Sequence, residues 1–210
     1  MITLDITISL DGYVAGPHPT LEAPLGEGAM GLHEWLFAAA SWRSRHGHEG
    51  GEATADSDVY EEMVSATGAQ IMGRRMFSGG AGPWESDPNA GGWWGDDPPF
   101  GIPVFVLTHH EREPLVLGTT TFTFVTGGIE QALTLAREAA GGRNVAIAGG
   151  ASAAQQFLGA GLVDELQLHI APVLLGAGLP LFGGVGPLEL EPLRVLDSPR
   201  ASHLRYRVSR

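Results

Sequence analysis

Three short glycine-containing segments could hold a ligand: two of them could bind a phosphate, and the third could cover a bound cofactor. The first is Gly73-Arg74-Arg75, which follows the apolar pair Ile71-Met72. Glycine allows a backbone to approach a ligand closely, and an arginine can hold two phosphate oxygens at once through its planar guanidinium. The segment therefore predicts a phosphate site. A solvent-exposed turn with two surface arginines is the alternative.

The second segment is the turn Gly149-Gly150, which lies between the apolar residues 145–147 and the small residues that begin at Ala151-Ser152. A strand, paired glycines and a helix N-terminus can cradle a pyrophosphate with backbone N–H groups. The spacing is not that of the complete dinucleotide fingerprint. An ordinary tight turn therefore remains the alternative.

The third segment is 11–16, with the sequence Asp-Gly-Tyr-Val-Ala-Gly. Asp-Gly is a common turn dipeptide, and it follows an alternating apolar run directly. The functional interpretation is a flexible lid beside a bound cofactor. The alternative is a plain turn.

Other kinds of site have little support. The histidine pairs 46/48 and 109/110 have no evident carboxylate partner, so we expect no metal site. The chain has no cysteine, which excludes disulfides and thiolate chemistry and is compatible with a cytoplasmic location. No Gly-x-Ser-x-Gly segment is present, so a serine hydrolase is not indicated.

The charge distribution excludes some partners and draws attention to the first segment. Residues 1–100 hold 15 acidic side chains and 4 arginines, and the whole chain has a formal charge of −12 and no lysine. Such a chain repels a nucleic-acid backbone, so we expect no nucleic-acid partner. No apolar run reaches the roughly 18 residues of a membrane span, so we expect no membrane partner. Arg74 and Arg75 are the only arginines between Arg45 and Arg112.

The elements that position these segments alternate between strand and helix patterns. Apolar alternation predicts a strand over 2–9, and shorter apolar runs predict strands near 69–72, 103–108, 122–126, 145–147 and 166–170. Helices are expected over 32–42, from the cap cluster 56–58 to Gly68, over 129–140 and over 151–158. Two late strands, near 188–196 and 202–208, predict an antiparallel hairpin. The pattern indicates a three-layer α/β domain with a mixed sheet.

The order of these motifs resembles the dihydrofolate reductase-like superfamily. The chain has, in sequence, Asp-Gly-Tyr-Val-Ala-Gly after the first strand, Met-Gly-Arg at 72–74, a strand that ends Val-Leu-Thr, the Gly-Gly turn, and Val-Asp-Glu-Leu-Gln-Leu-His-Ile-Ala-Pro at 163–172. Within the superfamily it is most similar to the reductase (C-terminal) domain of the bifunctional riboflavin-biosynthesis enzyme and its stand-alone bacterial relatives. The resemblance spans about residues 2–208. It implies a three-layer α/β/α fold with a mostly parallel central sheet.

The resemblance also implies a site for NADPH. Its phosphates would meet the Gly-Arg turn and the Gly-Gly turn, its adenosine 2′-phosphate would approach the end of the 104–107 strand, and its nicotinamide would lie beside the loop after the first strand. The cofactor-binding residues expected on this basis are Gly73, Arg74, Arg75, Thr108, His109, Gly149, Gly150, Ala151, Ser152, Val14, Ala15 and Gly16. Since a 2′-phosphate needs fixed cations in an acidic chain, the two arginines favour NADPH over NADH.

The catalytic acid is where the chain departs from the family pattern. Dihydrofolate reductase has a carboxylate near the start of its first helix, and here Glu34, beside Trp35, could take that place. It could also be an exposed acid next to a core tryptophan. Asp11 is the competing candidate, with a turn-forming role as its alternative. Long irregular insertions near 16–31, 43–55 and 78–100 are expected to surround the substrate pocket of a single domain spanning 1–210.

We therefore expect an NADPH-dependent reductase that transfers hydride to a small heterocyclic, carbonyl or imine substrate. A true dihydrofolate reductase is one alternative. A nucleotide-binding protein that retains the fold without the chemistry is another, from a different functional class. The apolar segment 179–182 among glycines predicts the interface of a homodimer.

Overall fold

β1 (Ile2–Ser9) lies near the middle of a nine-stranded sheet in the computed structural model, which describes residues 1–209. The strands follow the order β10-β11-β8-β1-β7-β3-β4-β6-β5. Their bounds are β3 (Thr67–Gly73), β4 (Pro103–Leu107), β5 (Leu115–Leu117), β6 (Thr120–Val125), β7 (Asn144–Gly149), β8 (Glu165–Ala171), β10 (Leu190–Asp197) and β11 (Ser202–Val208).

The sheet is mixed and mostly parallel. β8, β1, β7, β3, β4 and β6 run parallel to one another, whereas β11 is antiparallel to β8 and β10, and β5 is antiparallel to β6. β10 and β11 form the C-terminal antiparallel pair. The α/β class, the mixed sheet and the late hairpin are therefore confirmed.

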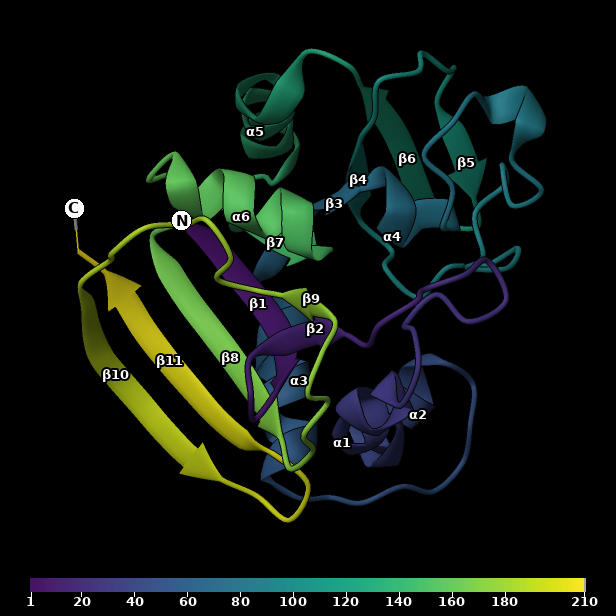
Figure 1. Cartoon of the computed structure of the whole chain (residues 1–210). Coiled ribbons are helices and arrows are strands. Elements are labelled where there is room, and N and C mark those ends of the chain that lie inside the picture. The colour runs from purple at the N-terminus through teal and green to yellow at the C-terminus, as the bar shows by residue number, and fades with distance from the viewer. Residues whose placement is uncertain (210) are drawn as a thin grey trace.

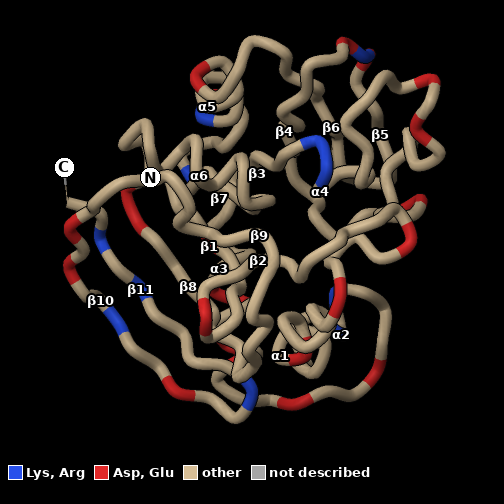
Figure 2. The backbone as a smooth tube through the Cα atoms, viewed as in Figure 1, with Lys and Arg blue, Asp and Glu red and all other residues tan. Residues whose placement is uncertain are grey.

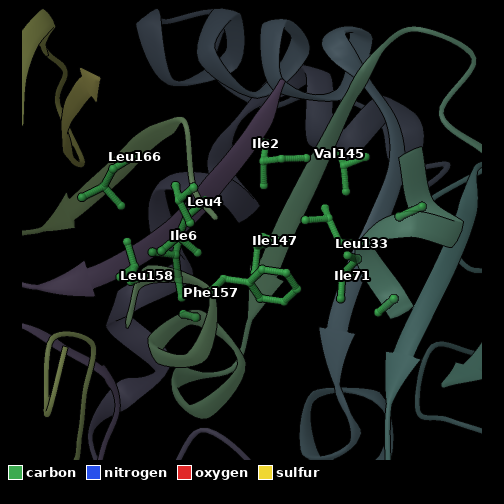
Figure 3. Close-up of a cluster of buried hydrophobic side chains, with 14 of the residues drawn as sticks. Ile2, Leu4, Ile6, Ile71, Leu133, Val145, Ile147, Phe157, Leu158 and Leu166 are labelled. Atoms are coloured by element: carbon green, nitrogen blue, oxygen red, sulfur yellow. The ribbon is translucent and has the colours of Figure 1, made fainter. Parts of the chain in front are cut away.

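The apolar side chains of β1 help to form the core on one face of the sheet. Ile2, Leu4, Ile6 and Ile8 are buried against α5 (Gly128–Ala139) and α6 (Ala151–Gly159), which cover this face (Figure 1). The close-up in Figure 3 shows Ile2, Leu4 and Ile6 in one cluster with Leu133 of α5 and Phe157 and Leu158 of α6. Burial of this apolar surface supplies the main core.

The polar side of β1 lies against the other helical layer. This layer contains η1 (Ala29–His33), α1 (Glu34–Ala38), α2 (Ala40–Arg45) and α3 (Ala55–Ala66), and α4 (Arg74–Ser78) follows β3. Trp35 of α1 is buried, and its indole Nε1 donates a hydrogen bond of 3.0 Å to the hydroxyl of Thr7. Of the polar residues of β1, Thr7 and Ser9 are buried, and Thr3 and Asp5 are partly buried.

The helix predicted over 32–42 is broken at Ala39. This residue has φ −64° and ψ 130°, an extended conformation that separates α1 from α2. The backbone N–H of the next residue, Ala40, donates a hydrogen bond of 3.0 Å to the carbonyl of Glu52, which holds the break in place. The sequence did not signal the break, because Ala38, Ala39 and Ala40 are all strong helix formers.

Gly68 does not end the helix before it, as the sequence suggested. α3 ends at Ala66, and Gly68 lies inside β3. A side chain there would collide with the backbone carbonyl of Ala140, at the end of α5. The glycine is needed because the helix end and the strand approach each other closely. The cap prediction for this helix also needs correction, because Asp56 lies within its first turn and Thr54 takes the cap position.

Three short strands were not predicted. β2 (Tyr13–Ala15) pairs antiparallel with β9 (Leu179–Pro180) in a separate small sheet, and β5 extends the edge of the large sheet. The expected insertions carry little regular structure, with η1 at the end of the first and η2 (Trp84–Ser86) inside the last. Within residues 1–209, no helix is long and apolar enough to cross a membrane.

Candidate functional site

The strand pairing brings two of the predicted segments together. β3 lies between β7 and β4 and is parallel to both, so the carboxyl ends of all three strands meet at one edge of the sheet. Met72 is opposite Gly149 in the register, and Gly73 is opposite Leu107. The Gly-Arg turn therefore has the Gly-Gly turn on one side and the Thr108 turn on the other. Ligands of open α/β sheets commonly bind at such an edge.

The two glycine turns approach each other closely. A Cβ atom placed on Gly73 would lie 3.7 Å from the carbonyl oxygen of Gly149 and 3.8 Å from the nitrogen of Gly150. Gly149 has φ +111°, a backbone conformation that residues other than glycine rarely adopt. The absence of side chains at both turns leaves backbone groups of two strands side by side. Such an arrangement suits a phosphate chain.

The N-terminus of α6 adds donors to this edge. Gly150 occupies the cap position, and no side chain caps the helix. Its first backbone N–H groups, which begin at Ala151 and Ser152, therefore lack a side-chain acceptor from the cap residue. Together with the positive end of the helix dipole, such groups attract an anion.

The two arginines after Gly73 have different environments. The Arg74 side chain is only 6% exposed and forms an ion pair with Asp87, whose side chain is 2% exposed. The Nε and Nη1 atoms of Arg74 are buried and have no hydrogen-bond partner among the described residues. Arg75 is exposed, and Figure 2 shows the basic segment at α4 near this edge. Only Arg75 therefore presents an exposed guanidinium to a ligand.

Arg74 is part of a cluster that the sequence did not reveal. Its Cζ atom lies 3.5 Å from the centre of the Trp84 ring, and the Cζ atom of Arg112 lies 4.8 Å from the same ring. The Trp84 indole donates a hydrogen bond of 2.9 Å to the carbonyl of His110. The insertion near 78–100 is thus anchored through a tryptophan in contact with two cations, an arrangement favoured by the ring quadrupole.

Asp87 balances the charge of this cluster. Burial by itself raises the pKa of this carboxyl, but hydrogen bonds from Ser78 and Arg74 and the Arg74 charge outweigh burial and hold the pKa below its ordinary value. Burial lowers the pKa of Arg112, as does the positive charge of Arg74. Trp84 and Asp87 lie close together in the sequence, but no sequence pattern indicated that they contact Arg74.

Thr108 and His109 lie at the end of β4 as predicted, but in different surroundings. Thr108 is buried, and its hydroxyl accepts a hydrogen bond of 3.1 Å from the backbone N–H of His110. It therefore stabilises the turn. His109 is exposed beyond it.

The loop after β1 is held in place on both sides. Val14 packs against the main core, and Ala15 pairs with Leu179 across β2 and β9. A side chain at Gly16 would collide with the carbonyl of Glu27. The segment is thus packed against β9 and the loop that contains Glu27. This packing differs from the open loop that the flexible-lid interpretation predicts. Val14 packs against the same core cluster that contains Ile6, and a Cβ on Gly149 would lie 3.3 Å from Ile6 Cδ1.

Asp11 takes the structural role that was its alternative interpretation. Its carboxylate accepts hydrogen bonds from the backbone N–H groups of Leu175, at 3.1 Å, and Gly176, at 2.7 Å. A side-chain bond from Ser9 and these backbone donors lower the pKa of Asp11 to about 2. It is ionised at neutral pH and so has no proton to donate. The side chain fastens the 173–178 loop to the end of β1.

Glu34 does not lie in an enclosed pocket. It is exposed in the first turn of α1, whereas its neighbour Trp35 is 2% exposed. Of the two interpretations of Glu34, the structure therefore agrees with the exposed acid next to a core tryptophan and not with a carboxylate in a pocket, because the helix turns Trp35 towards the sheet and Glu34 towards solvent. Among residues 1–209, no group of three or more His, Asp or Glu side chains could hold a metal ion.

Comparison with known proteins agrees with this architecture. Residues 1–203 match the model of the RibD C-terminal domain family. The chain belongs to this family. A curated relative, described as uncharacterized protein YyaP of Bacillus subtilis strain 168, is 51% identical over 193 residues, which cover 86% of this chain and 79% of that protein.

Solved structures share the fold at low sequence identity. A putative riboflavin biosynthesis protein from Shewanella sp. PV-4 has a TM-score of 0.64 and 21% identity, and the match covers 100% of this chain and 99% of that one. A bifunctional pyrimidine deaminase and uracil reductase of Thermotoga maritima has a TM-score of 0.57 and 13% identity, with 100% and 56% covered. The riboflavin biosynthesis reductase of Saccharomyces cerevisiae has a TM-score of 0.53 and 14% identity, with 100% and 89% covered. The expected fold of a dihydrofolate reductase-like reductase domain is thereby confirmed.

Proposed function

We propose that the protein is an NADPH-dependent reductase of small heterocyclic, carbonyl or imine compounds. The observation that supports this most strongly is the convergence of the Gly73 turn, the Gly149-Gly150 turn and the uncapped start of α6 at one edge of the sheet. Membership of the RibD C-terminal domain family supports the same activity, because the family includes proteins named as reductases.

The residues at this edge fit a dinucleotide with an additional phosphate. The glycine turns and the α6 amides, with Ser152 among them, would hold the pyrophosphate. Arg75 is the exposed cation, and with His109 it would meet the 2′-phosphate. The packed segment Val14–Gly16 would flank the nicotinamide. When bound, NADPH supplies the hydride, and the protein's part is to hold the donor and the acceptor carbon in line.

The proton that completes the reduction has no evident donor in the two expected acids. Asp11 is ionised and bonded to backbone amides, and Glu34 is exposed on α1. Water that reaches the edge of the sheet would then supply the proton. An electron-poor C=N or C=O group is a suitable acceptor, because it needs little assistance from an acid.

The second candidate function is nucleotide binding without turnover. The positions of Asp11 and Glu34 favour it, since neither of these predicted acids is placed as a proton donor. A true dihydrofolate reductase is less well supported, because Glu34 is exposed where that activity needs an enclosed carboxylate.

Oxidation of NADPH, followed by its absorbance with a panel of aminopyrimidines, pterins and simple carbonyls, separates these candidates. The reductase proposal predicts substrate-dependent loss of NADPH with at least one member of the panel. Saturable binding of NADPH without turnover on any member would favour the non-catalytic function. Turnover confined to dihydropterins would favour dihydrofolate reductase.

The proposal includes a homodimer in the cytoplasm. Leu179 and Phe182 are 38% and 44% exposed and lie in the segment predicted to form the interface. Leu181, between them, is fully buried in the main core and cannot take part in the contact. The apolar surface for association is therefore smaller than the segment suggested.

A further inference from the structure

Four titratable side chains form a continuous hydrogen-bonded chain inside the layer between the sheet and α3. Asp5 Oδ1 lies 2.9 Å from His169 Nε2, the two Nδ1 atoms of His169 and His203 lie 2.7 Å apart, and His203 Nε2 lies 2.9 Å from Asp56 Oδ1. The residues come from β1, β8, β11 and α3, so the chain connects elements that are far apart in sequence. We call it the Asp-His-His-Asp chain.

The chain is almost completely withdrawn from solvent. The side chains of His169, His203 and Asp56 are 1%, 2% and 2% exposed, and only Asp5, at 10%, reaches a small water-sized cavity at the amino-terminal edge of the sheet. The Trp35 ring covers both imidazoles, with its centre 4.5 Å from that of His169 and 5.1 Å from that of His203. Because the interior has a low dielectric constant, each polar atom in this chain must be paired.

The geometry fixes the number of hydrogens on the two imidazoles. Each Nε2 faces a carboxylate oxygen, so each carries a hydrogen when Asp5 and Asp56 are ionised. The facing Nδ1 atoms of His169 and His203 have room for one hydrogen, because two would collide and none would leave two lone pairs in contact. Three hydrogens on four ring nitrogens make one imidazolium and one neutral imidazole.

Other charged groups around the pair do not change this count. On α3, Asp56 also accepts a hydrogen bond from Ser198, and Tyr60 lies in the apolar cluster with Trp35. Arg200, in the turn before β11, is paired with Glu52, and Arg205 on β11 is paired with Glu165 and Glu62. Both arginines thus have ion-pair partners outside the chain.

We propose that His169 and His203 share a single proton and that the Asp-His-His-Asp chain is a pH-sensitive clamp that holds α3 against the sheet. The inference goes beyond the proposed function and does not depend on it. With one shared proton, all four side chains are bonded. A second proton places two hydrogens between the Nδ1 atoms and breaks the chain at its centre.

The low-pH behaviour follows from the proton count in the folded and unfolded chains. Below the ordinary histidine pKa of about 6.5, the unfolded chain binds a proton on each of the two histidines, whereas the folded pair holds one. Unfolding then takes up one proton, so stability falls as the pH falls. In agreement, burial and the neighbouring His169 lower the pKa of His203, against the opposing effect of Asp56.

The first test counts the hydrogens in the unaltered protein. Histidine side-chain nitrogens labelled with ¹⁵N are observed by NMR near pH 6.5. The clamp predicts three N–H hydrogens on the four ring nitrogens of His169 and His203, with one of them between the two Nδ1 atoms. Two hydrogens in total, one on each imidazole, would overturn the proposal.

The second test removes the competition between two imidazoles. In His203→Gln, the amide can donate to Asp56 and accept from His169, so the chain stays paired with one titrating ring. Urea unfolding is measured from pH 8 to pH 4.5. Above pH 7 the free energy of unfolding should depend on pH in the same way in the unaltered protein and in His203→Gln. Below pH 6.5 the unfolding equilibrium constant of the unaltered protein should rise relative to the variant by up to about tenfold per pH unit.

His18→Asn is the matched control, because His18 is exposed and has a positive φ of 52° that asparagine accepts. Its curve should stay parallel to that of the unaltered protein throughout. Parallel curves for His203→Gln below pH 6.5 would contradict the clamp. If that variant does not fold, the hydrogen count in the unaltered protein decides the matter alone.

Discussion

Arg74 and Arg75 are adjacent in sequence but differ in what they can bind. Arg74 forms an ion pair with Asp87 and lies over the Trp84 ring, whereas Arg75 is exposed at the edge where the glycine turns meet. Arg74 therefore has a structural role, whereas Arg75 has a proposed role in ligand binding. Asp11 also has a structural role, because its carboxylate fastens a loop and is not placed as a proton donor.

The buried pair makes a prediction about stability. Asp87→Asn leaves the Arg74 charge in the interior without a partner, so the free energy of unfolding should fall by about 3–5 kcal/mol. The unaltered protein should keep this stabilisation above the ordinary Asp pKa of about 3.9 and lose it as the pH falls through the lowered pKa of Asp87. Urea unfolding at pH 7 and pH 3 measures both effects. Asp96→Asn, at an exposed position of the same insertion, is the control and should change little.

Asp11 makes a prediction about the pH dependence of activity. Because its pKa is lowered to about 2, its contribution to stability is complete above about pH 4 and is lost as the pH falls towards 2. Between pH 5 and 9 it does not titrate. The pH profile of kcat for Asp11→Asn should therefore keep the shape of the unaltered profile, even if its height falls. A profile that loses a limb in this range would show that Asp11 is the proton donor after all.

At the scale of elements, the glycine turn between β7 and α6 carries the candidate site. Gly149 has φ +111°, and a Cβ there would lie 3.3 Å from Ile6 Cδ1. Gly149→Ala should lower the free energy of unfolding by about 1–2 kcal/mol and weaken NADPH binding, because the left-handed backbone is strained for alanine. Thermal unfolding and fluorescence titration measure the two effects.

Gly159→Ala is the matched control, at the end of α6, the helix that follows this turn. A Cβ at Gly159 meets nothing within 4 Å and its φ is not positive. This variant should be neutral or more stable by about 0.4–1 kcal/mol. Equal losses in both variants would mean that the conformation of Gly149 is not what the turn requires.

The elements also show why some of the structure was predictable. The alternation of β1 and the period of α5 were strong local patterns, and both elements formed within a residue or two of their predicted bounds. The order of glycine motifs gave the fold through resemblance. β2 and β9 were not found, because strands of three and two residues leave no periodicity to detect.

Long-range partners were the part that the sequence could not supply. Asp87 lies 13 positions after Arg74, and the two histidines of the buried chain are 34 positions apart. No local rule connects such residues. His169 could be placed on the polar side of its strand, but the side chain that faces it depends on the register between β8 and β11. The exposure of Glu34 likewise depended on which side of α1 meets the sheet.

At the scale of the whole molecule, the proposed homodimer has a direct test. Phe182 is 44% exposed beside Leu179, and we expect the two to lie at the contact between copies. The unaltered protein at micromolar concentration should sediment with twice the mass of one chain, and Phe182→Ser should shift it towards the monomer. Met30→Ser, which changes an equally apolar side chain that is 64% exposed elsewhere, should not. A monomeric mass for the unaltered protein would refute the proposed dimer.

The central claim is that the edge formed by β3, β4 and β7 binds NADPH, with Arg75 as the exposed cation for its 2′-phosphate. The most direct measurement is a tryptophan-fluorescence titration of the unaltered protein, Arg75→Ala and the surface control Arg137→Ala with NADPH and with NADH. The unaltered protein and the control should bind NADPH more tightly than NADH. Arg75→Ala should lose about tenfold to a hundredfold in affinity for NADPH and little for NADH, since one charge-assisted phosphate contact contributes about 1.5–3 kcal/mol. Equal losses for both cofactors, or no saturable binding of either to the unaltered protein, would contradict the assignment.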